Sequence, residues 1–158
     1  MENQTDGVSS DSFRLLDASE LELFNRLREA MPSLIVFAQV SMSQVYYLHS
    51  RRVDRLTRFG DMGRESIDFL LCRRDDNGVV AAVALKAAGP VSKVTSDLDA
   101  NKLSALRAVG IPVLVYVRNR LPEVQAIRKA INPLISSSPN YDRRQVSHAR
   151  TQGLPRPF

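Results

Sequence analysis

The sequence has a single cysteine, no long apolar run and no glycine-rich nucleotide-binding motif. The lone Cys72 excludes an internal disulfide and argues against a cysteine-based zinc site. No apolar stretch approaches the roughly 20 residues of a membrane-spanning helix, and the polar, acidic start of the chain is unlike a signal peptide. The chain also contains neither a phosphate-binding loop nor a dinucleotide fingerprint. We therefore expect a cytoplasmic protein that has no membrane partner.

The rest of the composition is that of an ordinary globular domain. The chain has 158 residues, of which 44% are hydrophobic and 25% are charged, and a chain of this length can bury a proper core. We expect a disordered acidic leader at residues 1–12, one folded domain at residues 13–135 and a basic, disordered tail at residues 136–158.

Basic residues are unevenly distributed along this chain, whose net charge is +5. One cluster lies in the segment 49–64 and another lies in the tail. Arginine suits phosphate because its planar guanidinium donates two hydrogen bonds at once. A merely solvated basic surface is the alternative for either cluster. We expect a nucleic-acid partner, DNA in preference to RNA, bound by the first cluster, which comprises Arg51, Arg52, Arg55, Arg58 and Arg64.

Hydrophobic periodicity predicts helices and strands in a mixed order. Asp17 and Glu20 have capping-box spacing at the start of a helix, and the turn-forming residues 75–78 predict a hairpin over residues 66–86. The apolar segment 111–117 is typical of a central, parallel strand. The expected order is helix 18–30, strand 34–42, an ambiguous segment 43–64, strands 66–74 and 79–86, helix 96–109, strand 111–117 and helix 122–135. This order favours a three-layer α/β/α fold with a mixed central sheet.

Asp68 and Lys86 lie on the two strands of the predicted hairpin. Metal-dependent phosphodiester hydrolysis needs oxygen ligands for a hard divalent cation, and a lysine that orients water or stabilises developing charge. If the hairpin register sets the two side chains close together, they form part of such a centre, with Asp68 as the metal ligand. The alternative is an ordinary surface pair, because acids and lysines at strand ends are common.

Five short motifs follow one another over about residues 13–135. They are Glu20 with Phe24 and Leu27, the strand residues 36–40, the strand residues 67–72, Asp99 with Lys102, and Gly110-Ile111-Pro112. In its order of elements the chain resembles the restriction-endonuclease-like nucleases, which are named for a Pro-Asp…(Asp/Glu)-X-Lys motif. More narrowly, the five motifs resemble those of an uncharacterised bacterial family of that superfamily, of the DUF2726 type, whose members also occur fused to zinc-ribbon or helicase modules. The resemblance implies a restriction-endonuclease-like fold.

The chain departs from this family at the third predicted strand. The strand of the family typically reads Ile-Glu-Leu-Asp and is followed by a Ser-His pair, whereas this chain has Val83-Ala84-Leu85-Lys86 and no Ser-His. The metal-binding glutamate of the family therefore corresponds to Ala84, whose methyl group cannot ligate a metal. The next acid corresponds to Lys86, which restores the lysine of the wider superfamily or pairs with Asp68.

The sequence is compatible with three functions. The first is a degenerate nuclease domain that binds nucleic acid without efficient cleavage and needs no cofactor, and the missing acid at Ala84 favours it. The second is an active Mg²⁺/Mn²⁺-dependent nuclease whose missing carboxylate comes from Glu20, Asp97 or Asp99, with Lys102 either in the site or exposed. These acids have structural alternatives, Glu20 in the capping box and the aspartates in offsetting the helix dipole. The third is a protein-interaction module of a mobile-element or defence system, which has a protein partner.

Overall fold

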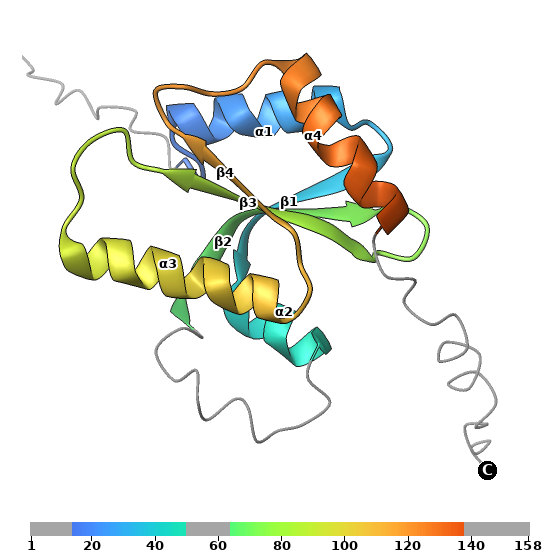
Figure 1. The fold of residues 1–158 in the computed structure, drawn as a ribbon. Coiled ribbons are helices and arrows are strands. Elements are labelled where there is room, and N and C mark those ends of the chain that lie inside the picture. Colours follow the sequence, from blue (N-terminus) through green and yellow to red (C-terminus); the bar gives the residue numbers. More distant parts are fainter. Residues whose placement is uncertain (1–13, 50–63, 138–158) are drawn as a thin grey trace, which may run out of the picture.

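The structure, a computed structural model, describes residues 14–49 and 64–137. These residues form three layers, with α1 and α4 on one face of a sheet and α2 and α3 on the other (Figure 1). The predicted α/β/α class is confirmed. No helix in the described ranges is long and apolar enough to cross a membrane. The elements are α1 (Ala18–Ala30), β1 (Leu34–Ser41), α2 (Met42–His49), β2 (Ser66–Arg73), β3 (Val79–Lys86), α3 (Lys93–Ala108), β4 (Val113–Val117) and α4 (Val124–Ser137).

The sheet is mixed, as expected, and its order is β1-β2-β3-β4. The pairs β1–β2 and β2–β3 are antiparallel, whereas β4 runs parallel to β3. The segment 111–117 was therefore predicted correctly as parallel and wrongly as central, because β4 lies at the edge of the described sheet. Its side chains are apolar on both faces because Leu114 and Tyr116 pack against one helical layer and Val113 packs against the other.

Two apolar clusters hold the layers together. The first joins α1 and α4 to the sheet and includes Leu23, Leu27 and Ile127, whereas the second joins α2 and α3 to it and includes Met42 and Leu106. These five side chains are at most 1% exposed, and burial of each contributes about 1.5–3 kcal/mol to folding. Strands β2 and β3 each have a strand on either side and contact both clusters, so they are the inner strands of the described sheet.

The side-chain alternation of β1 reverses at Gln39. Val36 and Ala38 pack against the first cluster, whereas Val40 packs against the second, although residues two apart in a regular strand face the same side. Gln39 has a backbone φ of +52°, in the left-handed region that residues other than glycine rarely adopt. This one residue therefore turns the rest of β1 toward the opposite layer.

The neighbouring strand β2 changes face at the same level. Ile67 belongs to the second cluster and Phe69 to the first, although they too are two residues apart. The register of the β1–β2 pair places Asp68 opposite Gln39. The predicted acid of β2 therefore lies where both strands are irregular, and such local irregularity is frequent at functional sites.

Helix α3 begins at Lys93 rather than at the predicted Ser96. The reason is a cap that the sequence pattern did not indicate, because the hydroxyl of Ser92 accepts a hydrogen bond from the N–H of Thr95 at 3.2 Å. The two acids predicted for the first turn, Asp97 and Asp99, therefore lie beyond it, where the helix dipole stabilises a carboxylate less.

Candidate functional site

Asp68 lies where β2 and β3 separate. The antiparallel ladder between the strands ends at the Phe69–Val83 pair. Beyond it, Oδ2 of Asp68 accepts a hydrogen bond from the N–H of Leu85 at 2.9 Å. The carboxylate thus accepts from a strand N–H, as a backbone carbonyl does within a ladder, and satisfies a donor that would otherwise be unpaired in a buried region.

A small hollow beside Asp68 brings several of the predicted site residues together. Its volume is about 120 Å³, and it lies between the separating ends of β2 and β3 and one side of α3. Ala84 presents only a methyl group to this hollow, at the position that the resemblance implied for a metal-binding glutamate. The residues that line the hollow are Asp68, Ala84, Leu85, Lys86, Asp99, Lys102 and Leu103.

Lys102 is the buried cation of this hollow. Only 9% of the residue is exposed, so the alternative of an exposed helix lysine was wrong, and its Nζ atom lies 3.7 Å from Oδ1 of Asp99. Burial raises the pKa of Asp68 above its ordinary value, whereas the N–H of Leu85 and the charge of Lys102 both lower it. The ammonium group of Lys102 therefore acts on both carboxylates that line the hollow.

Lys86 contributes to the rim of the hollow rather than to its interior. It is exposed at the last position of β3, and its carbonyl oxygen accepts a hydrogen bond from the N–H of Arg118 at 3.0 Å. Within residues 14–49 and 64–137 it forms no ion pair with Asp68. The lysine that acts electrostatically on Asp68 is thus Lys102, which belongs to α3 and not to β3.

Glu20 faces the same region from α1, but its two oxygens are already engaged. Oε2 accepts from the N–H of Asp17 at 2.9 Å and completes the predicted capping box. Oε1 accepts from Nε2 of Gln39 at 3.3 Å and from Nη2 of Arg118 at 3.4 Å. Glu20 raises the pKa of Asp68 through its charge, so it is close enough to act electrostatically. To ligate a metal it would have to give up bonds to three neighbours.

Gln39 and Arg118 also belong to the polar network beside Asp68, and the sequence did not identify either of them as a site residue. Oε1 of Gln39 accepts from the hydroxyl of Ser66 at 2.9 Å, so the side chain links β1, β2 and α1. Arg118 pairs with both Asp17 and Glu20. A polar glutamine within the apolar run of β1 was a visible signal for the first residue. For the second, the only signal was an arginine directly after an apolar strand.

The remaining predicted residues do not meet in this site. Asp97 is exposed on α3 and does not line the hollow. Arg64 is exposed just before β2. The other predicted arginines of the basic cluster lie outside the described residues, as do the leader 1–12 and the tail beyond residue 137; these arginines are Arg51, Arg52, Arg55 and Arg58.

The donor set of the hollow does not fit a divalent cation. Both of its carboxylates are already engaged, because Asp68 accepts from the N–H of Leu85 and Asp99 lies 3.7 Å from the ammonium group of Lys102. Ala84 supplies no ligand. Across the two described stretches of the chain, there is no group of three or more His, Cys, Asp or Glu side chains that could hold a metal ion.

Comparisons with other proteins give one partial relative. A segment of 70 residues is 34% identical to sorbitol dehydrogenase of Bos taurus, and it covers 44% of this chain but only 19% of that enzyme. The chain therefore spans less than a fifth of the length of this relative. No solved structure is significantly similar to the chain.

A family model gives a much more extensive match. The model of a protein family of unknown function, DUF2726, matches residues 13–134. The matched range includes α1, the whole sheet, α3 and most of α4, and therefore every residue that lines the hollow beside Asp68. The chain belongs to the DUF2726 family.

Proposed function

We propose that this chain is a nuclease-like domain that has lost metal-dependent cleavage and binds nucleic acid. The observation that carries the proposal is the hollow beside Asp68, in which a methyl group replaces the second acid and a buried lysine supplies the positive charge. The established family has no assigned function, so the proposal depends on the geometry of this site and on the resemblance noted from the sequence.

Support for a nuclease origin comes from the arrangement of elements around Asp68. The resemblance implies an acid on the second strand and an acid-X-lysine motif on the third, with a helix from the chain start beside them. Here Asp68 and Lys86 lie on adjacent strands and line one hollow, and Glu20 of α1 acts on Asp68 through its charge. An unrelated surface pair has no reason to line a hollow that also contains a buried lysine and a second acid, Lys102 and Asp99.

Support for the loss of cleavage comes from Ala84 and Lys102. A Mg²⁺ site is built from one or two carboxylates together with substrate phosphate, and here one carboxylate position is a methyl group. The other carboxylate, Asp68, is bonded to the N–H of Leu85 and lies in the field of Lys102. A cation would have to displace an internal charge that the fold already supplies.

Support for nucleic-acid binding comes from charge. The chain has a net charge of +5, and Lys86 is exposed at the rim of the hollow. Without a metal, a basic surface can still bind phosphates and release counterions. The proposal of binding thus rests on the basic charge of the chain, and the proposal of lost cleavage rests on the missing acid at Ala84.

The proposal is tested by measuring binding and cleavage in the same preparation. Labelled single- and double-stranded oligonucleotides are titrated with the full chain over a salt series, and plasmid and linear single strands are incubated with Mg²⁺ or Mn²⁺. We expect binding that weakens with salt and no cleavage above that of the Asp68→Ala variant. Metal-dependent cleavage that Asp68→Ala abolishes would instead establish an active nuclease, and the absence of any binding would refute the proposal.

A further inference from the structure

A second hollow lies along the open edge of β1, away from the hollow beside Asp68. Its volume is about 450 Å³, within the usual range of ligand-binding clefts. It lies between the end of α1, the start of β1 and the residue that follows β2. Its lining comprises Phe24, Arg28, Glu29, Pro32, Leu34, Ile35, Val36 and Arg74.

The two arginines of this hollow, Arg28 and Arg74, are exposed. Within the described ranges, neither Arg28 nor Arg74 forms an ion pair with a carboxylate. Arg28 lies over the ring of Phe24, with its Cζ atom 5.6 Å from the ring centroid, and Nε of Arg74 donates to the carbonyl of Pro32 at 3.2 Å. Both guanidinium groups are thus held at the hollow while most of their N–H groups stay available. The neighbouring Arg73, by contrast, is paired with Asp76.

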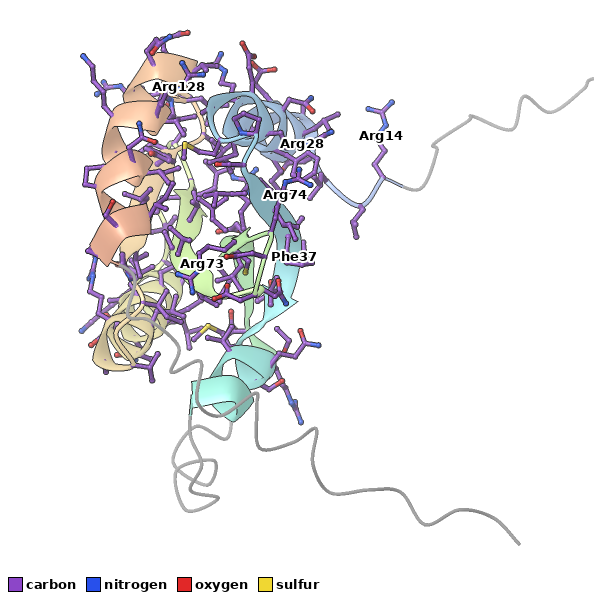
Figure 2. The ribbon with its side chains drawn as sticks, turned by 90° about the vertical axis from the view of Figure 1, so that its right-hand side faces the viewer. Arg14, Arg28, Phe37, Arg73, Arg74 and Arg128 are labelled. Atoms are coloured by element: carbon purple, nitrogen blue, oxygen red, sulfur yellow. The ribbon has the colours of Figure 1, made fainter. Side chains whose placement is uncertain are left out.

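An aromatic ring is exposed farther along the same edge strand. Phe37 is 40% exposed although it lies in a strand, and it directly follows Val36, the last strand residue of the hollow. Figure 2 shows Phe37, Arg74 and Arg28 along the same side of the molecule. An exposed phenylalanine and arginines without carboxylate partners along one edge of a sheet suit a single strand, because bases stack on the ring while guanidinium groups contact the phosphates.

Charge and shape together favour one class of ligand. The unpaired positive charge of Arg28 and Arg74 favours a polyanion, and Glu29 is the one acid of the lining. A ring on an edge strand can stack only on a base that is free to leave its own stack, which a duplex does not offer. Arg74 lies six residues after Asp68, just beyond the end of β2, or about 20 Å away at the rise of a strand, so this surface is separate from the hollow beside Asp68.

We propose that the β1 edge binds single-stranded nucleic acid, with one base stacked on Phe37 and phosphates bound by Arg28 and Arg74. This inference depends on the proposed nucleic-acid binding and adds the strandedness of the ligand and the surface that holds it. The hollow at the opposite end of β2 is then not the main docking site.

The test is a fluorescence-anisotropy titration of the full chain with a short labelled oligothymidylate over a salt series. Arg28→Gln and Arg74→Gln should each lower the slope of log affinity against log salt by about 0.7. Phe37→Leu should weaken binding by about tenfold and leave the slope unchanged, because a leucine keeps apolar contact but has no ring to stack. Since the chain has no tryptophan, Phe37→Trp should retain binding and report stacking by quenching of its fluorescence.

The matched control is Arg107→Gln, which removes an equal charge from the last turn of α3 and should leave the slope unchanged. If the wild type binds but all the β1-edge variants behave like it, this inference is wrong and the proposed function stands. Equal losses for a labelled duplex would overturn the single-strand assignment. If the wild type binds no nucleic acid at all, both proposals fail.

Discussion

At the scale of single residues, two side chains determine the charge and the ligands available in the hollow beside Asp68. Ala84 removes a ligand, and Lys102 supplies a charge that is 9% exposed and 3.7 Å from Asp99. A buried ammonium group persists only when carboxylates offset its desolvation. Asp99, which lies beside Lys102, is therefore needed by the fold even where it serves no chemistry.

Replacing Ala84→Glu should restore metal binding. The new carboxylate would enter the hollow beside Asp68, and we expect Mn²⁺ affinity to rise by about tenfold or more over that of the wild type. Isothermal titration with Mn²⁺ measures this directly. Ala84→Gln is the control, because it adds the same bulk without the charge. An equal gain in both variants, or in neither, would contradict the assignment of this position.

The buried negative charge of Asp68 should destabilise the fold, whereas the hydrogen bond that its carboxylate accepts should stabilise the fold. Asp68→Asn keeps an acceptor for the N–H of Leu85 and should be at least as stable as the wild type at neutral pH, whereas Asp68→Ala should lose about 1–3 kcal/mol because that N–H becomes unpaired. Thermal unfolding of the three proteins at neutral pH measures both effects. A destabilised Asp68→Asn would show that its charge is needed against Lys102.

The same residue predicts a pH dependence. The pKa of Asp68 is raised, chiefly by burial, so the folded state binds this proton more tightly than the unfolded state does. Its contribution to stability is therefore fully present below the ordinary pKa and is lost as the pH rises through the folded pKa. The advantage of Asp68→Asn over the wild type should accordingly be absent below the ordinary pKa of 3.8 and grow as the pH rises above it.

At the scale of elements, the start of α1 connects the fold to the site. Asp17 caps the helix, and it pairs with Arg118 while Glu20 completes the capping box and contacts Gln39. The first turn of one helix thus fixes the polar network that borders Asp68.

Asp17→Ala should destabilise the fold by about 1 kcal/mol at neutral pH. The N–H of Glu20, with help from Arg118, holds the pKa of Asp17 below its ordinary value of 3.8. Its contribution is therefore present above that value and lost as the pH falls through the folded pKa. Chemical denaturation at neutral and acid pH measures the change. Ser92→Ala removes the cap of α3 without a titrating group, so its cost should not vary with pH in this range.

Much of the secondary structure could be predicted from local patterns. The capping box of α1 and the hairpin of β2 and β3 follow from residue spacing and turn chemistry, and both are confirmed. The edge position of β4 could not be predicted, because helices on both faces give an edge strand the same apolar pattern as a central one. The burial of Lys102 was also not predictable, since a lysine on a helix is exposed unless tertiary packing places acids around it.

At the scale of the whole molecule, two surfaces at opposite ends of β2 carry the proposed chemistry. One is a hollow of about 120 Å³ with an internal cation, and the other is a hollow of about 450 Å³ with two unpaired arginines. Neither surface uses a bound metal in the proposed function.

Nucleic-acid affinity should therefore not depend on a divalent metal. We expect the dissociation constant measured in EDTA and that measured in Mn²⁺ at matched ionic strength to agree within about twofold, because the arginine contacts depend on salt alone. A metal requirement for binding would contradict this expectation and point back to the hollow beside Asp68.

The left-handed backbone at Gln39 also affects how the molecule meets other copies of itself. An exposed strand edge is a template for pairing with another chain, and natural proteins interrupt such edges to avoid aggregation. Because φ at Gln39 is +52°, the outer edge of β1 is interrupted at this residue. A second strand could pair regularly with only part of β1, so the backbone distortion that lies level with Asp68 also limits edge-to-edge pairing.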